Sequence, residues 1–421
     1  MTAATAAVGA ARTRWLTRER IFGLAYLGVA VLIVVVFSGV AGEDTKFGLN
    51  SGPRPAIPLP DLIVPSQLAI WLMAAVCAFL GVVQLLKAGT RWWAIMLAIV
   101  AFAFVAAFVT WAAAGKSMSL VGLLSQTLQR SVPITFGALS GLMCERAGVV
   151  NIAIEGMLLT GAFTGAVVGS VAQNVWVGLG ASVVVGGLLG LLLGVLAIRY
   201  LVDQIIAGTV INIFAAGITA FLSARILMDH PDLNNPPRFL PNEIPVLGDI
   251  PIVGPILFTN SFFVYALFVL ILVIHLALFH TRYGLRVRAV GEHPIAAETV
   301  GIDVIRTRYI NVLLGGMLAG FGGAYFTLGS TGSFDENMTA GKGFIGLAAM
   351  IFGGWTPVGA FFASLVFGFA DALQNRLSIL NAGIPSEVLL MLPYIVTIIV
   401  VAGLVGRVRA PAADGKPFKR E

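Results

Sequence analysis

The chain has 421 residues, of which 58% are hydrophobic and only 11% are charged. Soluble globular proteins carry roughly 25% charged residues, so this composition excludes an ordinary water-soluble domain and places the chain in lipid. The net charge of +6 does not indicate nucleic-acid binding, because the basic residues lie in short loops and near the termini. Cys77 and Cys144 fall in or beside apolar runs, which favours packing residues over a disulfide or metal site.

Uncharged runs long enough to cross a bilayer follow one another along the chain. A transmembrane helix needs roughly 20 apolar residues. The first run, 21–42, is longer than the roughly 7–15 residues of a signal-peptide core, so it predicts an uncleaved first helix. The residues Gly353 to Pro357 break a run that is too long for one span, which predicts a half-length helix before the break. The predicted segments are 21–42, 62–86, 92–115, 119–143, two within 156–198 with a turn at 173–174, 204–224, 261–280, 309–334, the half-helix 344–352, 358–375 and 388–406.

The predicted fold is therefore an all-α polytopic membrane protein with about twelve transmembrane segments, including one short half-helix. Arginine and lysine collect in every second loop and at both ends of the chain, and such loops face the cytoplasm. Both termini are expected to be cytoplasmic. The outer loop 227–260 is rich in proline and stiff, which suits either a docking surface or a passive connector.

The basic loop 282–308 contains the signals of a short helix. Pro294 suits the first helical turn, Ala296, Ala297 and Glu298 are good helix formers, and Gly301 can close the end. An exposed helix on the cytoplasmic side is not required to span the bilayer. It is the kind of element that a pore-forming subunit presents to a soluble motor.

Three charged residues fall within the predicted spans, where a central charge costs at least about 2.5–3.5 kcal/mol. Arg130 and Asp371 are candidates for a translocation pathway, although Arg130 could instead cap a surface segment and Asp371 could lie at the outer end of its helix. Glu155 is expected to pair with Arg146. Small residues at four-residue spacing predict close helix packing: Gly161, Gly165 and Gly169; Gly186, Gly190 and Gly194; Gly316 and Gly320.

No catalytic constellation and no metal-ligand spacing emerge from the sequence. Gly115-Lys116-Ser117 matches the end of a phosphate-binding loop, but Thr110 stands where the first glycine is required and a membrane span precedes it. The four histidines are scattered. An enzyme is therefore not expected.

Several long motifs resemble the permeases of ABC importers of the ribose and branched-chain amino acid type. ERAGVVNIAIEGMLLTGAF begins at Glu145 and is most similar to the branch that imports nucleosides. AVGEHPIAAETVGI, GGMLAGFGGAYFTLG and GKGFIGLAAMIFGGWTPVGAFFASLVFGFADAL follow in the expected order. The resemblance covers 119–406, and its motif residues are Glu145, Arg146, Gly148, Asn151, Glu155 and Gly156.

This resemblance implies a permease subunit for nucleosides that works as a dimer with the same or a homologous permease. Two ATPase subunits would bind ATP and Mg²⁺, with no cofactor on this chain, and an extracellular substrate-binding lipoprotein would deliver the cargo. The coupling helix that contacts the ATPase would comprise Glu292, His293, Pro294, Ala296, Ala297, Glu298, Val300 and Gly301. For a neutral, polar cargo, the expected pathway lining is Asn151, Asn212, Thr327, Ser330 and Phe334 together with Arg130 and Asp371.

The implied domains are an N-terminal extension of three transmembrane helices over 1–117, a permease domain over 118–406 with the coupling loop 282–308, and a cytoplasmic tail over 407–421. The extension departs from the family pattern, and scaffolding or an interface with the partner permease are both open for it. A ribose-type sugar is the alternative cargo. An ion-coupled secondary transporter is the main rival class, and a membrane enzyme is a third.

Overall fold

The computed structural model describes residues 18–40, 42–50, 57–86, 92–380, 385, 387–389, 391, 394 and 409–419. The chain forms two compact units. One unit contains the residues up to Val121 together with Leu377–Ile384, and the other contains Gly122–Arg376 and Pro385–Glu421.

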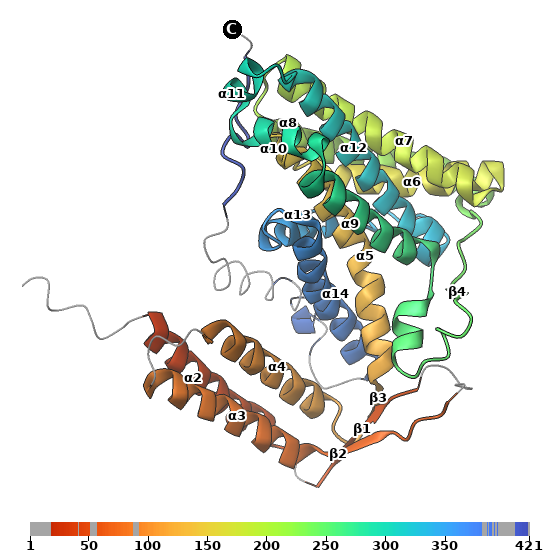
Figure 1. The fold of residues 1–421 in the computed structure, drawn as a ribbon. Helices are drawn as coiled ribbons and strands as arrows, with labels where there is room; N and C mark the ends of the chain where they lie inside the picture. Colours follow the sequence, from red (N-terminus) through yellow and green to blue (C-terminus); the bar gives the residue numbers. More distant parts are fainter. Residues whose placement is uncertain are drawn as a thin grey trace, which may run out of the picture. The chain divides into compact units, whose positions relative to one another are not determined.

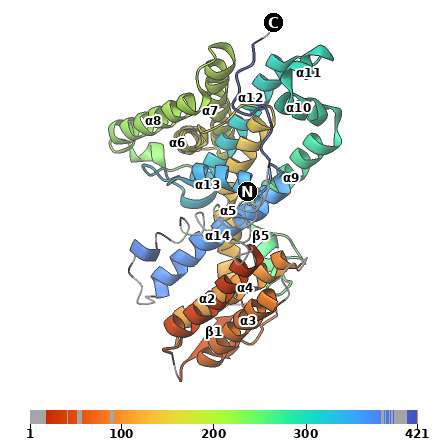
Figure 2. The ribbon, with the colours of Figure 1, turned by 90° about the vertical axis from the view of Figure 1, so that its left-hand side faces the viewer.

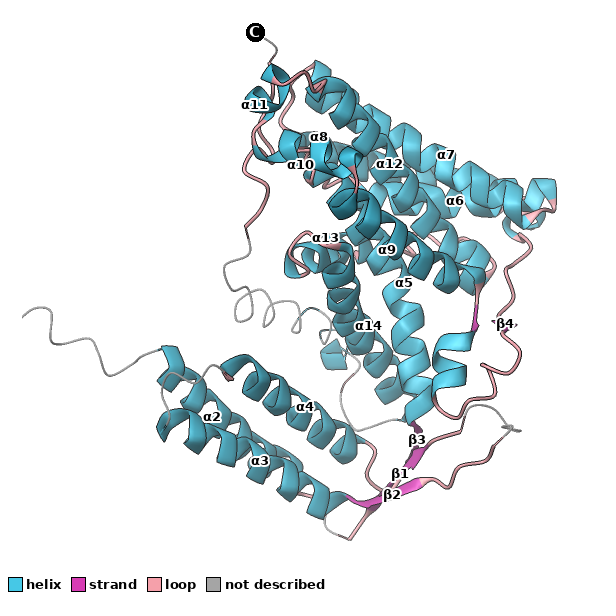
Figure 3. Ribbon diagram, viewed as in Figure 1, coloured by secondary structure: helices cyan, strands magenta, loops and turns pink. Residues whose placement is uncertain are grey.

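The first unit is a three-helix layer joined to a small sheet. Helices α2 (Arg18–Phe37), α3 (Ser66–Leu86) and α4 (Trp93–Ala112) pack around one buried apolar cluster. Strands β1 (Asp44–Gly48), β2 (Leu62–Pro65) and β3 (Ser117–Ser119) form a sheet in the order β2-β1-β3, shown in magenta in Figure 3. The predicted span 62–86 is wrong over its first four residues, because these pair antiparallel with β1 and the helix starts only at Ser66.

The second unit is a helical bundle (Figure 1). Its helices are α5 (Leu120–Glu145), α6 (Ile154–Ala172), α7 (Val175–Gly194), α8 (Gln204–Leu222), α9 (Phe262–His280), α10 (Arg282–Glu292), α11 (Pro294–Thr299), α12 (Val304–Ala324), α13 (Lys342–Phe352) and α14 (Pro357–Leu380). Shorter π and 3₁₀ turns are η1 (Val195–Arg199), η2 (Ser223–Leu227), η3 (Pro231–Asn234), η4 (Gly254–Phe258) and η5 (Tyr325–Thr331), and strands β4 (Asn242–Glu243) and β5 (Thr259–Asn260) pair in the loop before α9.

Helices α6, α7 and α12 lie side by side, and their glycines are the reason (Figure 1). A Cβ at Gly161 would lie 2.7 Å from the carbonyl oxygen of Gly320, and one at Gly190 would lie 2.7 Å from that of Val312. Small residues thus allow the backbones to touch, as helix packing in lipid requires. The predicted role of the glycine stripes is confirmed at these positions.

Nine helices of the described residues are long and apolar enough to cross a membrane. Helix α5 is long enough, but it carries Arg130 and Pro133 and is less apolar. The predicted half-helix is confirmed as α13, an apolar helix of 11 residues. The predicted span 388–406 lies almost wholly outside the described residues.

At two of the predicted boundaries, one polar side chain caps the start of the helix that follows. The turn at 173–174 is confirmed: Gln173 is left-handed at φ 46°, and the side chain of Asn174 accepts hydrogen bonds from the first backbone N–H groups of α7. The span predicted to begin at 309 instead begins at Val304. Asp303 caps that start, accepting a hydrogen bond from the N–H of Arg306 at 3.0 Å, so the two arginines that follow are helical.

Candidate functional site

The predicted short helix of the basic loop is α11, and it is capped at its start. The Nδ1 atom of His293 accepts a hydrogen bond from the backbone N–H of Ala296 at 3.2 Å. Pro294 occupies the first turn, where its missing N–H is not needed. The residues before it, predicted as loop, form the additional helix α10.

The end of α11 is closed by Gly301, as predicted. Gly301 is left-handed at φ 83°, and its N–H donates to the carbonyl of Glu298 at 2.9 Å. The N–H of Ile302 donates to the carbonyl of Ala297 at 3.0 Å. This pair of bonds is a Schellman motif, which fixes the helix to a single length.

The two faces of α11 differ, and the difference corrects one expectation. Ala297 is only 3% exposed and packs within the chain, so it is not available to a partner subunit. Ile295 is 59% exposed and Val300 is 75% exposed. Ala296 is exposed as well. The outward side of this helix and its C-cap therefore exposes the apolar side chains of Ile295 and Val300 beside Thr299.

A segment near the C-terminus passes beside α12 (Figure 2), and its contacts reach α10 and α11. The N–H of Ala413 donates to the carbonyl of Gly291 at 2.8 Å, and the N–H of Ala412 donates to the carboxylate of Glu292 at 3.2 Å. Phe418 is buried in one cluster with Val290, Ala297 and Val304. We call residues 411–418 the tail strap.

The tail strap also contacts the loop that follows α5. Asp414 lies near Glu145 and Arg308, and burial raises the pKa of Asp414 to about 6, against a smaller lowering by a hydrogen bond with Glu145 and by the charge of Arg308. Gly148 is left-handed at φ 81°, and a Cβ there would lie 3.2 Å from the carbonyl oxygen of Ala413. A glycine is therefore required where the strap passes.

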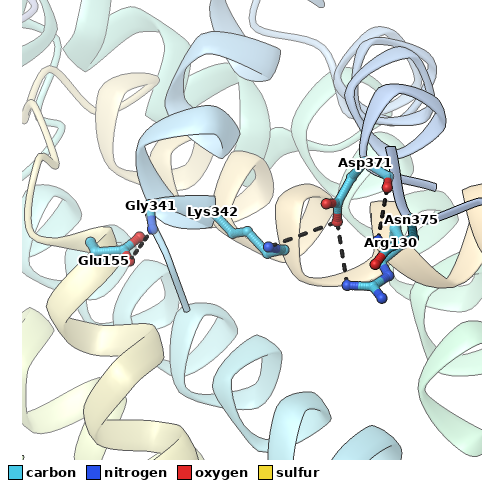
Figure 4. A network of polar contacts seen from close by, with 6 residues as sticks. All are labelled: Arg130, Glu155, Gly341, Lys342, Asp371 and Asn375. Carbon is cyan, nitrogen blue, oxygen red and sulfur yellow. Dashed lines mark hydrogen bonds and ion pairs between the residues drawn. The ribbon is translucent and has the colours of Figure 1, made fainter. Parts of the chain in front are cut away.

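The charged residues of the ERAGVVNIAIEG motif bind both ends of the half-helix α13. The carboxylate of Glu155 accepts hydrogen bonds from the N–H groups of Gly341 and Gly343 at 2.8 and 2.6 Å and from the hydroxyl of Thr339 at 2.6 Å. Figure 4 shows the contact with Gly341. A carboxylate at a helix N-terminus is favoured by the helix dipole.

At the other end of α13, Arg146 donates to the carbonyl of Trp355 at 2.9 and 2.6 Å and to that of Gly354 at 3.4 Å. The indole N–H of Trp355 donates to the carboxylate of Glu145 at 2.7 Å. The expected pairing of Arg146 with Glu155 is thus wrong. Each charge instead satisfies backbone groups at one end of α13, and both charges suit the dipole of that helix.

Other expected pathway residues are engaged inside the bundle. Asn151 is fully buried, and its amide donates to Ser140 Oγ at 3.3 Å. Asn212 accepts from the N–H of Gly156 and donates to the carbonyl of Ile152, both at 2.8 Å, so it joins α8 to the start of α6. These side chains hold helices together in the described arrangement and do not face an open path.

The same holds at the far end of α12. Thr327 is fully buried and donates to the carbonyl of Ala162 at 3.1 Å. Phe334 is 2% exposed and packs edge-on against Phe163, with ring centroids 5.1 Å apart. Ser330 is the exposed member of this group.

Arg130 and Asp371 do come together, and Lys342 joins them (Figure 4). A nitrogen of Arg130 lies 3.5 Å from Asp371 Oδ2, and Lys342 Nζ lies 3.8 Å from the same oxygen. The three residues line a cavity of about 240 Å³ between α5, α13 and α14. We call this group the charge cluster.

Residues 123–401 match the family described as the permease component of the branched-chain amino acid transport system. The chain belongs to this permease family. It is accordingly a multi-pass membrane protein and a transport subunit, with ATP hydrolysis on a separate ATPase chain.

Three relatives show how far the likeness of this permease extends. The guanosine ABC transporter permease protein NupQ of Bacillus subtilis is 39% identical over 72% of this chain and 98% of the relative. The nucleoside ABC transporter permease protein NupC of Lactococcus lactis is 36% identical over 70% of this chain and 95% of the relative. A putative glucose ABC transporter permease protein of Haloferax volcanii is 31% identical over 61% of this chain and 77% of the relative. No solved structure matches the chain.

The permease family match begins at 123 and therefore excludes the helices α2, α3 and α4. These helices form the compact unit that ends at Val121. Since the Bacillus relative is covered over 98% of its length, the extension is additional to what that permease contains.

Sequence reasoning missed the tail strap and Lys342. The sequence predicts a cytoplasmic tail over 407–421. Within it, Phe418 is a lone aromatic residue in a polar stretch with Pro411 and Gly415. That isolated ring was the available signal. Lys342 lies just before the predicted half-helix 344–352, whereas the observed helix α13 begins with it.

Proposed function

We propose that this permease forms the translocation pathway of an ABC importer for nucleosides, and that its ATPase partner binds the outward face of α11. The observation that carries the second part is a short helix, capped at both ends, that exposes Ile295 and Val300. The exposed apolar surface of a rigid element is more stable when it is buried in a groove of a partner than when it contacts water. The nucleoside cargo is supported by the names of the guanosine and nucleoside relatives.

The proposed arrangement has about twelve transmembrane segments with both termini in the cytoplasm, a permease domain over 118–406 and a cytoplasmic tail over 407–421. A second permease subunit, the same or homologous, completes the pathway, and a substrate-binding lipoprotein delivers the nucleoside from outside. ATP and Mg²⁺ are bound by the ATPase. Its closure would move α11, and the bundle would switch between two packings through differential contacts.

Within this proposal, the pathway residues are Arg130 and Asp371. Asn151, Thr327 and Phe334 are buried and Asn212 is half-buried, and all four already have partners in the bundle. In the described state these four residues make packing contacts, so we do not propose them as cargo contacts. Ser330 stays a candidate because it is exposed.

The experiment is ATP-driven uptake by the purified complex in proteoliposomes, with radiolabelled guanosine. The variant Ile295→Glu is expected to lower uptake at least about tenfold, because a buried charge at the ATPase contact costs more than 1.4 kcal/mol. Ile295→Leu is the matched control, since it keeps the apolar contact and should retain uptake. The thermal unfolding of both variants should match the wild type.

Three outcomes would contradict the proposal. Full uptake by Ile295→Glu would remove α11 from the ATPase contact. Uptake driven by an ion gradient without ATP would favour a secondary transporter. Uptake of a sugar with no uptake of guanosine would favour the alternative suggested by the glucose relative.

A further inference from the structure

Two residues of the charge cluster lie well inside long helices of the bundle. Arg130 is the eleventh residue of the 26-residue helix α5, and Asp371 is the fifteenth residue of the 24-residue helix α14. At 1.5 Å per residue, Arg130 is about 15 Å from the start of its helix. Its side chain is nevertheless 45% exposed. Because a charge in contact with lipid at this depth is unfavourable, this face must meet water, a polar ligand or a partner subunit.

The carboxylate of Asp371 is incompletely satisfied. Both ion pairs are long for direct hydrogen bonds, at 3.5 and 3.8 Å. No donor among the described residues forms a hydrogen bond with the buried Oδ2 atom. The nearby guanidinium of Arg376 is turned away and donates to Gln126 at 3.0 Å. An under-satisfied carboxylate beside a cavity can accept hydrogen bonds from a ligand.

The cavity has one polar wall and one apolar wall. The polar wall carries the charge cluster with Gln374 and Asn375, and the apolar wall carries Ile134, Ile345 and Phe367. Its volume of about 240 Å³ is below the roughly 300–1,000 Å³ of complete small-molecule pockets. The cavity in this subunit is therefore large enough to enclose only part of a nucleoside-sized ligand.

We propose that this cavity binds the ribose of the transported nucleoside and that Asp371 accepts hydrogen bonds from its vicinal 2′- and 3′-hydroxyls. This inference rests on the proposed function. Acidic side chains recognise ribose hydroxyls in this way in dinucleotide-binding folds. Arg130 and Lys342 lie 3.5 and 3.8 Å from Asp371, whose carboxylate is the only one among the described residues that line the cavity. The two oxygens of such a carboxylate can accept hydrogen bonds from a ligand with paired hydroxyls.

The test compares two substrates in the reconstituted complex: guanosine and 2′,3′-dideoxyguanosine, which lacks both hydroxyls. In Asp371→Asn, the KM for guanosine uptake is expected to rise about tenfold, as for loss of one charge-assisted hydrogen bond. Uptake of the dideoxy analogue should stay near the wild-type value. The wild-type preference for guanosine would therefore fall by the same factor. The same substrate-binding protein serves both complexes, so a changed preference arises in the permease.

The control is Glu336→Gln, which removes an exposed carboxylate outside the cavity and should leave the preference intact. Asp371→Glu is the second variant. It keeps the charge, preserves folding and shifts the carboxylate by one methylene, so the guanosine preference should fall to an intermediate value. If both Asp371 variants slow the two substrates equally, or change neither, the residue is a structural ion pair and the inference is overturned. Failure of the wild type to import either nucleoside would instead overturn the proposed function.

Discussion

The guanidinium of Arg308 lies 5.9 Å from the ring centroid of Phe418 and donates a hydrogen bond to the carbonyl of Lys416 at 3.1 Å. Arg308 belongs to α12 and is 1% exposed. The strap residue Phe418 shares its cluster with Ala297 of α11. The end of the chain thus joins the proposed coupling helix to the transmembrane helix that follows it.

Replacement of Phe418 by alanine should loosen α11. Burial of an aromatic side chain contributes about 1.5–3 kcal/mol, so its loss should raise amide hydrogen exchange in 294–302 at least about tenfold. Exchange in α6 should not change, because the strap cluster does not include that helix. Hydrogen exchange with mass spectrometry measures both regions in one experiment.

The control for this variant is Lys419→Ala, since Lys419 is exposed and adjacent. Unchanged exchange in 294–302 for Phe418→Ala would show that α11 is held by α10 and α12 without the strap.

Attachment of the tail strap should depend on pH through Asp414. Its pKa is raised from 3.8 to about 6 when the strap is bound. The bound strap therefore holds its proton more tightly than a free strap. Through Asp414, attachment is strongest below about pH 4 and weakens as the pH rises toward 6. Glu145 and Arg308 are the charged groups that face Asp414.

Asp414→Asn should remove this pH dependence and strengthen attachment at neutral pH, because a neutral amide does not incur the cost of burying a charge. Fluorescence anisotropy of a probe at Lys419→Cys reports attachment, and the native Cys77 and Cys144 are buried and should not label. Weaker attachment of the asparagine variant at pH 7 would mean that pairing with Arg308 outweighs the cost of burial.

The sequence predicts correctly those helix ends that are determined by neighbouring residues. Pro294 and Gly301 set the ends of α11, and Asn174 set the start of α7, through bonds to neighbouring backbone groups. The half-helix followed from its length and its glycine-rich break. These features need only the covalent neighbourhood of a residue and could be read directly.

The missed features depend on distant backbone partners. Arg146 and Glu155 are expected to pair because both lie near the cytoplasmic face, whereas their partners are carbonyl and N–H groups about 190 to 210 positions away. Strand β1 pairs with β3 across an intervening segment of two helices. Nearly every residue carries the same backbone N–H and C=O groups. The sequence therefore does not show which of these groups will form a hydrogen bond with a distant side chain.

The glycine contact between α7 and α12 yields the last prediction. A Cβ at Gly186 would overlap the carbonyl oxygen of Gly316 and would lie 2.6 Å from the Cα of Gly320. Ala in place of Gly favours a helix by about 0.5–1 kcal/mol, but overpacking costs about 1–3 kcal/mol. Gly186→Ala should therefore lower the thermal unfolding temperature in detergent.

Gly180 on the same helix is the matched control, because no atom lies within 4 Å of its added Cβ. Gly180→Ala gains the helix preference without a clash, so its unfolding temperature should stay level or rise. The sign of the difference between the two variants is the decisive quantity. Equal shifts would mean that α7 and α12 separate enough in detergent to accept a methyl group, and that close backbone contact does not hold this part of the bundle together.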